Sequence, residues 1–246
     1  MGISATEDLV TVERPDGAGP LVLVCDHASN AVPAGFAALD VPSEVMETHV
    51  AWDPGALQVA QLLAAATDSP LVYPRATRLL LDCNRTPDAP GSIVARSEDT
   101  EVPGNRDLAL EERLARVRRI YTPFHAAIDA VIDRRLARRQ PTAVVAIHSF
   151  TPVYHGKPRP WDVGVLHDRD RGLADLLLQR LRADGDVVVG DNEPYAPRDG
   201  VYHTLARHAE ARGLPSVMIE IRNDRLADRA GQAGWGDRLA RHLVQA

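Results

Sequence analysis

The 246-residue sequence has two cysteines and a single lysine, and it contains no long apolar run. Cys25 and Cys83 lie in or at the end of predicted buried strands, which argues against a disulfide framework and favours a reduced, cytoplasmic protein. No apolar run approaches the roughly 20 residues of a membrane-spanning helix. Residues 1–16 are polar and acidic, without the basic and apolar regions of a signal peptide. We therefore expect no signal peptide and no association with a membrane.

Other missing features disfavour whole classes of function. The net charge of −6 gives no reason to propose a nucleic-acid surface. Lys157 is the only lysine, and the dominance of arginine is most simply a coding bias. Ser149 follows His148, but no Gly-x-Ser-x-Gly elbow surrounds it. Gly17-Ala18-Gly19 precedes the first predicted strand rather than following it, so it is not a dinucleotide-binding turn.

Short apolar runs alternate with amphipathic segments along the chain. The predicted strands cover residues 21–25, 71–73, 79–81, 142–148, 163–167, 187–189 and 214–219. The predicted helices cover residues 54–66, 108–139 with a kink or break at Pro123, 172–181, 203–211 and 225–244. Residues 88–107 and 151–162 are predicted loops. This alternation predicts one α/β/α sandwich over the whole chain, with residues 1–18 as an N-terminal extension.

Chemically useful side chains follow or end four of the predicted strands. They are His27, the polar cluster from Asp82 to Asp88, His148 and Glu220. Ligand sites in open α/β sheets form at the carboxyl ends of the strands, so we expect these residues to share one edge of the sheet. Two imidazoles and an oxygen donor form a good Zn²⁺ site with a fourth position left open. Glu220 is a candidate general base beside such a site.

Each of these residues also has a structural interpretation. His148 taken alone could be an ordinary buried histidine. Asp53, directly before a predicted helix with Pro54 in its first turn, could be an N-cap. Glu220 and Arg222 stand at strand spacing and could form a structural ion pair.

Seven segments together resemble one known family. They are Asp26-His27-Ala28-Ser29-Asn30 with Pro33, Ala51-Trp52-Asp53-Pro54-Gly55-Ala56, Thr77-Arg78-Leu79 running into Asp82-Cys83-Asn84-Arg85, Tyr121 to His125, Ile147 to Pro152, Asn192-Glu193-Pro194-Tyr195, and Glu220-Ile221-Arg222-Asn223-Asp224. From about Leu21 to Asp224 the chain resembles the N-formylglutamate amidohydrolases, a family similar in fold to the zinc carboxypeptidases. The resemblance implies a three-layer α/β/α fold with a mixed, mostly parallel sheet.

The resemblance to the zinc carboxypeptidases also implies roles for individual residues. His27 and His148 match the two histidine ligands of one Zn²⁺ ion per chain, and Glu220 matches the catalytic glutamate. The sequence departs from the family pattern at Asn30, which stands where those enzymes have a glutamate ligand. Asp53 is our first candidate for the third ligand, Asp26 is the second, and Asn30 itself stays open.

The same resemblance implies a set of residues that contact the substrate. Asn84 and Arg85 match a pair that clamps a substrate carboxylate, and either Arg222 or Arg78 is expected to stabilise the oxyanion. Asn30, Tyr195 and Ser149 are expected to lie against the substrate.

The implied function is a zinc-dependent amidohydrolase that cleaves the N-acyl or N-formyl amide of a small carboxylate-bearing molecule. The alternatives are a metallopeptidase, a deacylase for another N-acyl amino acid, and a metal-free binding protein of the same fold. The expected partner is a small molecule rather than nucleic acid or membrane, and the oligomeric state is not in the sequence.

Overall fold

The computed structural model describes residues 9–244, so the first eight residues of the expected N-terminal extension lie outside the described part. Its main sheet has seven strands in the order β1-β3-β2-β6-β11-β9-β10. Their bounds are Val10–Glu13 (β1), Leu21–Val24 (β2), Leu71–Pro74 (β3), Ala143–Phe150 (β6), Val163–Leu166 (β9), Val189–Asp191 (β10) and Ser216–Arg222 (β11). Strands β3, β2, β6 and β11 are parallel, whereas β1 is antiparallel to β3 and β9 is antiparallel to β11. The expected α/β fold with a mixed, mostly parallel sheet is confirmed.

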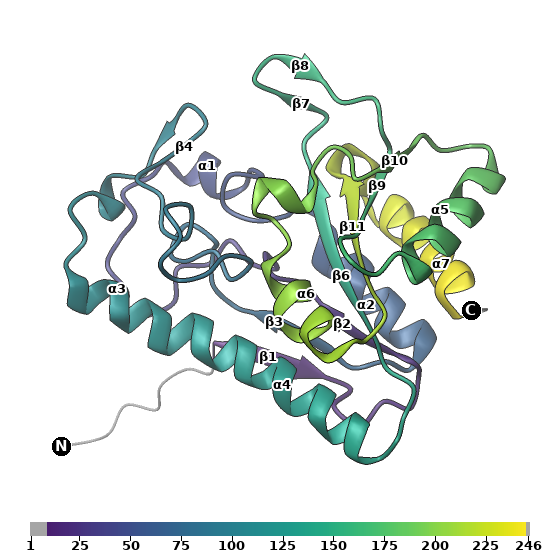
Figure 1. Cartoon of the computed structure of the whole chain (residues 1–246). Coiled ribbons are helices and arrows are strands. Elements are labelled where there is room, and N and C mark those ends of the chain that lie inside the picture. The colour runs from purple at the N-terminus through teal and green to yellow at the C-terminus, as the bar shows by residue number, and fades with distance from the viewer. Residues whose placement is uncertain (1–8, 245–246) are drawn as a thin grey trace.

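Helices cover both faces of this sheet (Figure 1). One face carries α4 (Thr122–Ala137) and α6 (His203–His208), and the other carries α2 (Ala56–Thr67), α5 (Gly172–Asp184) and α7 (Arg229–Val244). Helix α3 (Leu110–Arg116) precedes α4 and lies beyond the edge of the sheet. A short helix, α1 (Ser43–Met46), lies in the connection before α2. Alternate residues of β6 join the two cores: Val144 and Ala146 pack toward α4, and Val145 and Ile147 pack toward α2. Burial on both faces explains why this strand is one continuous apolar run.

Two small hairpins lie outside the main sheet. They are β4 (Arg96–Ser97) with β5 (Thr100–Glu101), and β7 (Val153–Tyr154) with β8 (Lys157–Pro158). The first lies within the predicted loop 88–107 and the second within the predicted loop 151–162. In Figure 1 the β7–β8 hairpin lies above the carboxyl end of β6, and β4 lies to its left, beside α1.

The structure corrects the prediction of a strand at Leu79–Leu81. These leucines are buried, but their backbone forms a turn in which the Leu80 N–H donates to the Thr77 carbonyl at 3.1 Å. The Leu79 and Leu80 carbonyls accept hydrogen bonds from the side chains of Asn105 and Arg116 at 2.8 and 3.0 Å. Side chains therefore take the place of a neighbouring strand as hydrogen-bond partners.

Two further segments differ from the prediction, and one predicted break is confirmed. Val10–Glu13 lies in the expected extension yet forms the edge strand β1, and strand β10 begins two residues later than predicted. The long helix predicted over residues 108–139 is divided, as expected, just before Pro123, where a π-helical turn over Val117–Tyr121 separates α3 from α4.

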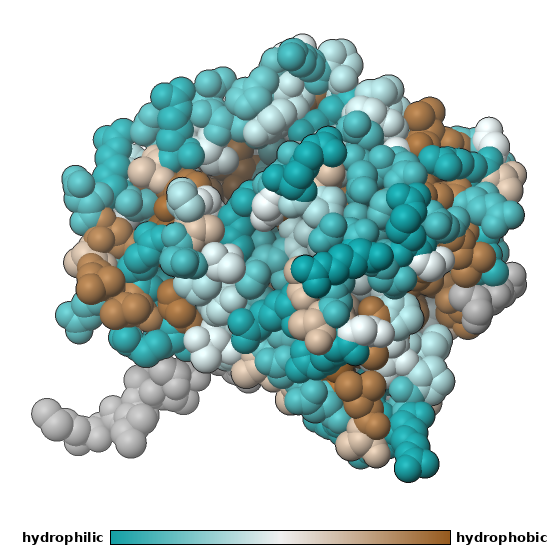
Figure 2. Space-filling view, in the orientation of Figure 1, coloured by the Kyte–Doolittle hydropathy of each residue, from teal (hydrophilic) through white to brown (hydrophobic). Residues whose placement is uncertain are grey.

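Two expectations of absence concern the cysteines and the membrane. Cys25 and Cys83 are both buried and free. Within residues 9–244, no helix is both long and apolar enough to cross a bilayer. The face of the molecule in Figure 2 is mainly hydrophilic, with small separate apolar patches.

Candidate metal centre and substrate pocket

His148 and Glu220 are brought side by side by the central strands. Strands β6 and β11 pair in parallel with His148 directly opposite Glu220. Cross-strand partners point to the same face of a sheet, so both side chains project to one side. Both strands continue for two residues beyond these positions, so His148 and Glu220 lie within the strands rather than in the loops that follow them.

His27 and Asp53 are delivered by connections rather than by strands. His27 lies three residues beyond the end of β2. The Asp53 N–H donates to the His27 carbonyl at 3.0 Å, which ties the segment before α2 to the end of β2. Gly55 follows with a φ of 81°, a left-handed conformation that lets the chain turn into α2 directly after Asp53.

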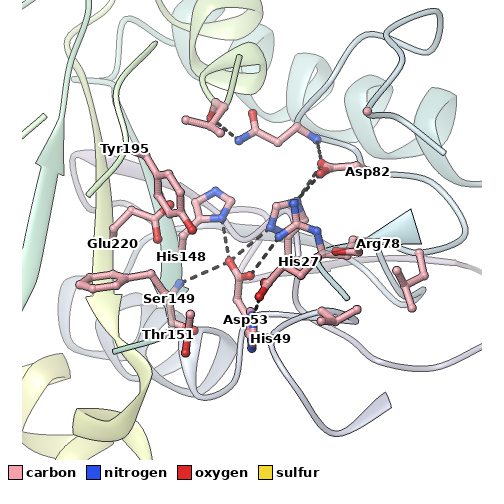
Figure 3. A pocket seen from close by; sticks show the side chains of 18 of the residues that line it. His27, His49, Asp53, Arg78, Asp82, His148, Ser149, Thr151, Tyr195 and Glu220 are labelled. Atoms are coloured by element: carbon pink, nitrogen blue, oxygen red, sulfur yellow. Dashed lines mark hydrogen bonds and ion pairs between the residues drawn. The ribbon is translucent and has the colours of Figure 1, made fainter. Parts of the chain in front are cut away.

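These connections bring His27, Asp53 and His148 together as a buried group of potential metal ligands (Figure 3). One donor atom from each lies within 4.8 Å of the other two. Asp53 Oδ2 is 3.3 Å from His27 Nδ1 and 2.8 Å from His148 Nδ1. Asp53 thus faces both imidazoles and does not serve as a side-chain N-cap of α2.

The other nitrogen of each imidazole is held by a second carboxylate. His27 Nε2 lies 2.8 Å from Asp82 Oδ1, and His148 Nε2 lies 3.1 Å from Asp26 Oδ2. Carboxylates in this outer position fix the orientation of metal-binding histidines. Asp26 therefore stands behind His148, on the side away from Asp53.

The electrostatics of this group suit a cation. Burial acts to raise the Asp53 pKa, but the nearby His27 and the hydrogen bonds from both imidazoles outweigh it and hold the pKa far below its ordinary value. Burial acts to lower the His148 pKa, but hydrogen bonds to Asp26 and Asp53 raise it well above its ordinary value. Each ring bridges two carboxylates through both nitrogens, which an imidazole does as a double donor when it is protonated. A divalent cation would replace the Nδ1 protons, so the donor set fits a metal ion.

Glu220 differs from the three aspartates because no hydrogen bond from the described part of the chain holds its carboxyl group and burial outweighs the attraction of His148, His27 and Arg78. Its side chain is buried, and its Oε2 atom has no hydrogen-bond partner among residues 9–244. Burial raises the pKa of this carboxyl group to about 7. A buried carboxyl group without a partner, next to a candidate metal site, has the properties of a general base.

A pocket of about 230 Å³ opens above these residues. In Figure 3, Glu220 and Tyr195 lie on one side of the three potential ligands, and Arg78 and Asp82 lie on the other. Arg78 reaches Asp82 Oδ2 at 2.7 Å and Asp53 Oδ1 at 3.6 Å. Arg85 lies 3.6 Å from Asp82 Oδ2 and donates to the Gly200 carbonyl at 3.1 Å.

Most residues expected to contact the substrate line this pocket. Those that do are Arg78, Asn84, Arg85, Ser149 and Tyr195. The amide of Asn84 is engaged by backbone, since its oxygen accepts from the Thr204 N–H at 3.0 Å and its nitrogen donates to the Val201 carbonyl. Ser149 donates from Oγ to the Pro54 carbonyl at 2.9 Å.

Arg222 and Asn30 are not among the residues that line the pocket. Arg222 ends β11, and its guanidinium binds Asp224 at 2.8 Å, Asp162 at 3.2 Å and the Arg159 carbonyl at 3.2 Å. It therefore pairs with aspartates rather than with Glu220, and Arg78 is the arginine that faces the potential ligands. Asn30 donates to Glu47 Oε1 at 3.2 Å.

The pocket residues that sequence reasoning missed include His49 and Glu98. Their side chains meet at 2.6 Å between Nε2 and Oε1. Glu98 lies in the turn of the β4–β5 hairpin, within a stretch whose Pro, Gly and acidic residues predict only a long loop. The one available signal was that a long loop in a compact domain is often functional.

Comparisons with known proteins agree with this architecture. The family model for N-formylglutamate amidohydrolase matches residues 19–227. Among solved structures, the gene product Atu2144 from Agrobacterium tumefaciens is 44% identical, over 97% of this chain and 94% of that chain, with a TM-score of 0.94. An N-formylglutamate amidohydrolase from Ralstonia eutropha JMP134 shares the fold at 23% identity, over 97% of this chain and 96% of that chain, with a TM-score of 0.73. A search of curated proteins gave no match. With a family match over most of its length, the chain belongs to the N-formylglutamate amidohydrolase family.

Proposed function

We propose that this protein is a zinc-dependent amidohydrolase that removes an N-formyl or other small N-acyl group from an amino acid. The observation that carries the proposal is the buried group of His27, Asp53 and His148, with the unpartnered carboxyl group of Glu220 beside it. Two histidines, one carboxylate and an open position form the ligand set of hydrolytic zinc sites. The small pocket favours an N-acyl amino acid over a longer peptide.

The metal would be held by His27 Nδ1, His148 Nδ1 and a carboxylate oxygen of Asp53. When bound, it would supply Lewis-acid polarisation of the scissile carbonyl and lower the pKa of a water molecule. Asp82 and Asp26 keep the two imidazoles oriented through their Nε2 atoms.

Glu220 is the proton carrier in this proposal. Its carboxylate takes a proton from the attacking water and then gives it to the departing amine, so one group serves both halves of the reaction. A pKa raised to about 7 by burial suits this double role, because proton uptake and release are then nearly balanced near neutral pH. Arg78 is the arginine that we assign to the oxyanion, since it lines the pocket beside Asp53.

Arg85 is our candidate for binding the substrate carboxylate. Its guanidinium makes one hydrogen bond to a carbonyl and a long contact with Asp82, which leaves donors free toward the pocket. A guanidinium binds a carboxylate through two parallel hydrogen bonds, which gives orientation as well as affinity. We assign Asn84 the supporting role of holding residues 201–204 against this side of the pocket.

Metal analysis combined with an activity assay tests the proposal. We expect about one zinc per purified wild-type chain and hydrolysis of an N-formyl amino acid, with both lost in His148→Ala. His242→Ala is the control, because this histidine lies in α7 and binds Asp184, away from the pocket. A wild-type protein that takes up no metal after zinc is supplied would support the binding-protein alternative instead. Metal uptake without hydrolysis of N-formyl or N-acetyl amino acids would favour the metallopeptidase alternative.

A further inference from the structure

The arginines around the pocket suit a substrate with one carboxylate better than a substrate with two. Its lining contains two arginines, Arg78 and Arg85. Arg78 is already bound to Asp82 and lies near Asp53. Arg85 is therefore the cation that is free to bind a substrate anion, and it can satisfy one carboxylate.

A third arginine lies close by without reaching the pocket. Arg159 is 8% exposed, and its guanidinium lies over the rings of Tyr154 and Tyr195, at 4.4 and 4.6 Å from their centroids. The two tyrosines line the pocket, but Arg159 does not. The two tyrosine rings, rather than the Arg159 guanidinium, face the pocket, so Arg159 does not provide a second binding group for a substrate carboxylate.

The remaining polar wall of the pocket carries a carboxylate instead of a cation. Glu98 accepts a hydrogen bond from His49 through Oε1, and its Oε2 atom has no hydrogen-bond partner among the described residues. The Glu98 side chain is 23% exposed, so it is held in place yet open to the pocket. Ser97, next to it, adds a hydroxyl group to the same wall.

Arg85 and Glu98 belong to one stretch of chain that closes this side of the pocket. Arg85, Gly91, Val94 and Glu98 all line it, and Arg85 packs so closely on Gly91 that a Cβ there would lie 3.0 Å from the Arg85 Nε atom. The carboxylate and the side chain of an amino acid leave the same carbon atom. With the substrate carboxylate at Arg85 and the acyl group at Glu220 and the potential metal ligands, the polar lining left for the side chain is that of Ser97 and Glu98.

We infer that Glu98 is a specificity residue, which selects an N-acyl amino acid with a neutral hydrogen-bond-donating or cationic side chain over one with a second carboxylate. The inference rests on the amidohydrolase function proposed above. A side-chain amide or amine donates to the free Glu98 oxygen, whereas a side-chain carboxylate meets a like charge in a confined space. N-formylglutamine is thus a better substrate than N-formylglutamate, although the two have nearly the same shape.

The test compares these two compounds on the zinc-loaded protein. We expect kcat/KM for N-formyl-L-glutamine to exceed that for N-formyl-L-glutamate by about tenfold or more, because juxtaposed like charges discriminate strongly. In Glu98→Gln the ratio should fall toward one, mainly through a gain on N-formyl-L-glutamate. Asp99→Asn is the matched control: it removes the same charge from the same turn, but Asp99 is 98% exposed and does not line the pocket. It should keep the wild-type ratio.

A wild-type preference for N-formyl-L-glutamate, or a ratio that Glu98→Gln leaves unchanged, would overturn the inference while the amidohydrolase function stands. If neither compound nor its N-acetyl counterpart is hydrolysed, the proposed function fails, and calorimetric binding of the two N-formyl compounds decides the inference. Tighter binding of the glutamine derivative to the wild type, lost in Glu98→Gln, supports the role of Glu98. Equal binding refutes it.

Discussion

Glu220 should lower the stability of the metal-free protein. Replacing it with glutamine should therefore raise the unfolding free energy while lowering the activity. Its carboxyl group is buried, and one of its oxygens has no hydrogen-bond partner within residues 9–244. Burial raises its pKa from 4.5 to about 7. The folded state therefore binds a proton more tightly at Glu220 than the unfolded state does, so the unfolding free energy falls as the pH rises between these two values.

The size of this loss follows from the pKa difference. One pKa unit corresponds to about 1.4 kcal/mol, so ionising Glu220 removes up to about 3 kcal/mol of unfolding free energy. This stability is present below pH 4.5 and is lost as the pH passes through about 7. A glutamine at this position carries no charge at any pH and escapes the loss, although its amide still lacks a partner.

Urea unfolding of wild type and Glu220→Gln, with a chelator present, measures the effect. At pH 8 the variant should be the more stable protein by about 2–3 kcal/mol, and at pH 5 the difference should fall below about 1 kcal/mol. Activity of the zinc-loaded variant should fall by about 10²–10⁴-fold, the usual contribution of a general base, at an unchanged zinc content. An equal pH dependence in both proteins would refute the account of Glu220 as an acid whose pKa is raised by burial.

Three further variants test the rest of the site. Asp82→Asn removes the carboxylate that orients His27, so zinc affinity should fall about 10–100-fold in a competition with a chelator; an unchanged affinity would contradict the orienting role. Arg85→Ala should raise KM for an N-formyl amino acid about 10–100-fold but leave KM for its carboxamide nearly unchanged, and equal effects on both would argue against carboxylate binding. Arg159→Met keeps an apolar stem but removes a buried cation from two tyrosine rings, which should lower the unfolding free energy by about 1–2 kcal/mol in urea. A variant as stable as wild type would show that these ring contacts contribute little.

Buried strands were predicted correctly from the sequence where neighbouring strands supply the backbone hydrogen bonds, and wrongly where side chains supply them. Residues 143–147 were correctly predicted as a strand because both faces are buried, so every side chain is apolar. Leu79–Leu81 is also a buried apolar run, yet it forms a turn in which Asn105 and Arg116 satisfy two of its carbonyls. Composition reports burial, and it does not report which group accepts or donates the backbone hydrogen bonds.

Within the candidate site, the sequence predicted the residues near strand ends but not those in irregular segments. His27, His148 and Glu220 stand at or near the ends of buried strands, so the rule that sites form at the carboxyl edge of a sheet brings them together from sequence. His49 and Glu98 could not be found in this way. They come from irregular segments 49 residues apart, and only the fold of the β4–β5 hairpin brings their side chains to 2.6 Å.

The potential ligand set contains a carboxylate beside His27 although Asn30 occupies the position of the motif glutamate. Asn30 stands three residues after His27, where the zinc carboxypeptidase pattern has a glutamate, and its amide is bound to Glu47. Asp53 comes from 26 residues further along the chain, but a backbone hydrogen bond to the His27 carbonyl fixes its main chain beside the same histidine. One oxygen of Asp53 then lies within 3.3 Å of both Nδ1 atoms and of the Ser149 N–H. A metal ion responds to the charge and position of the donor atoms rather than to their order in the chain, so an amide at position 30 is compatible with a two-histidine, one-carboxylate centre.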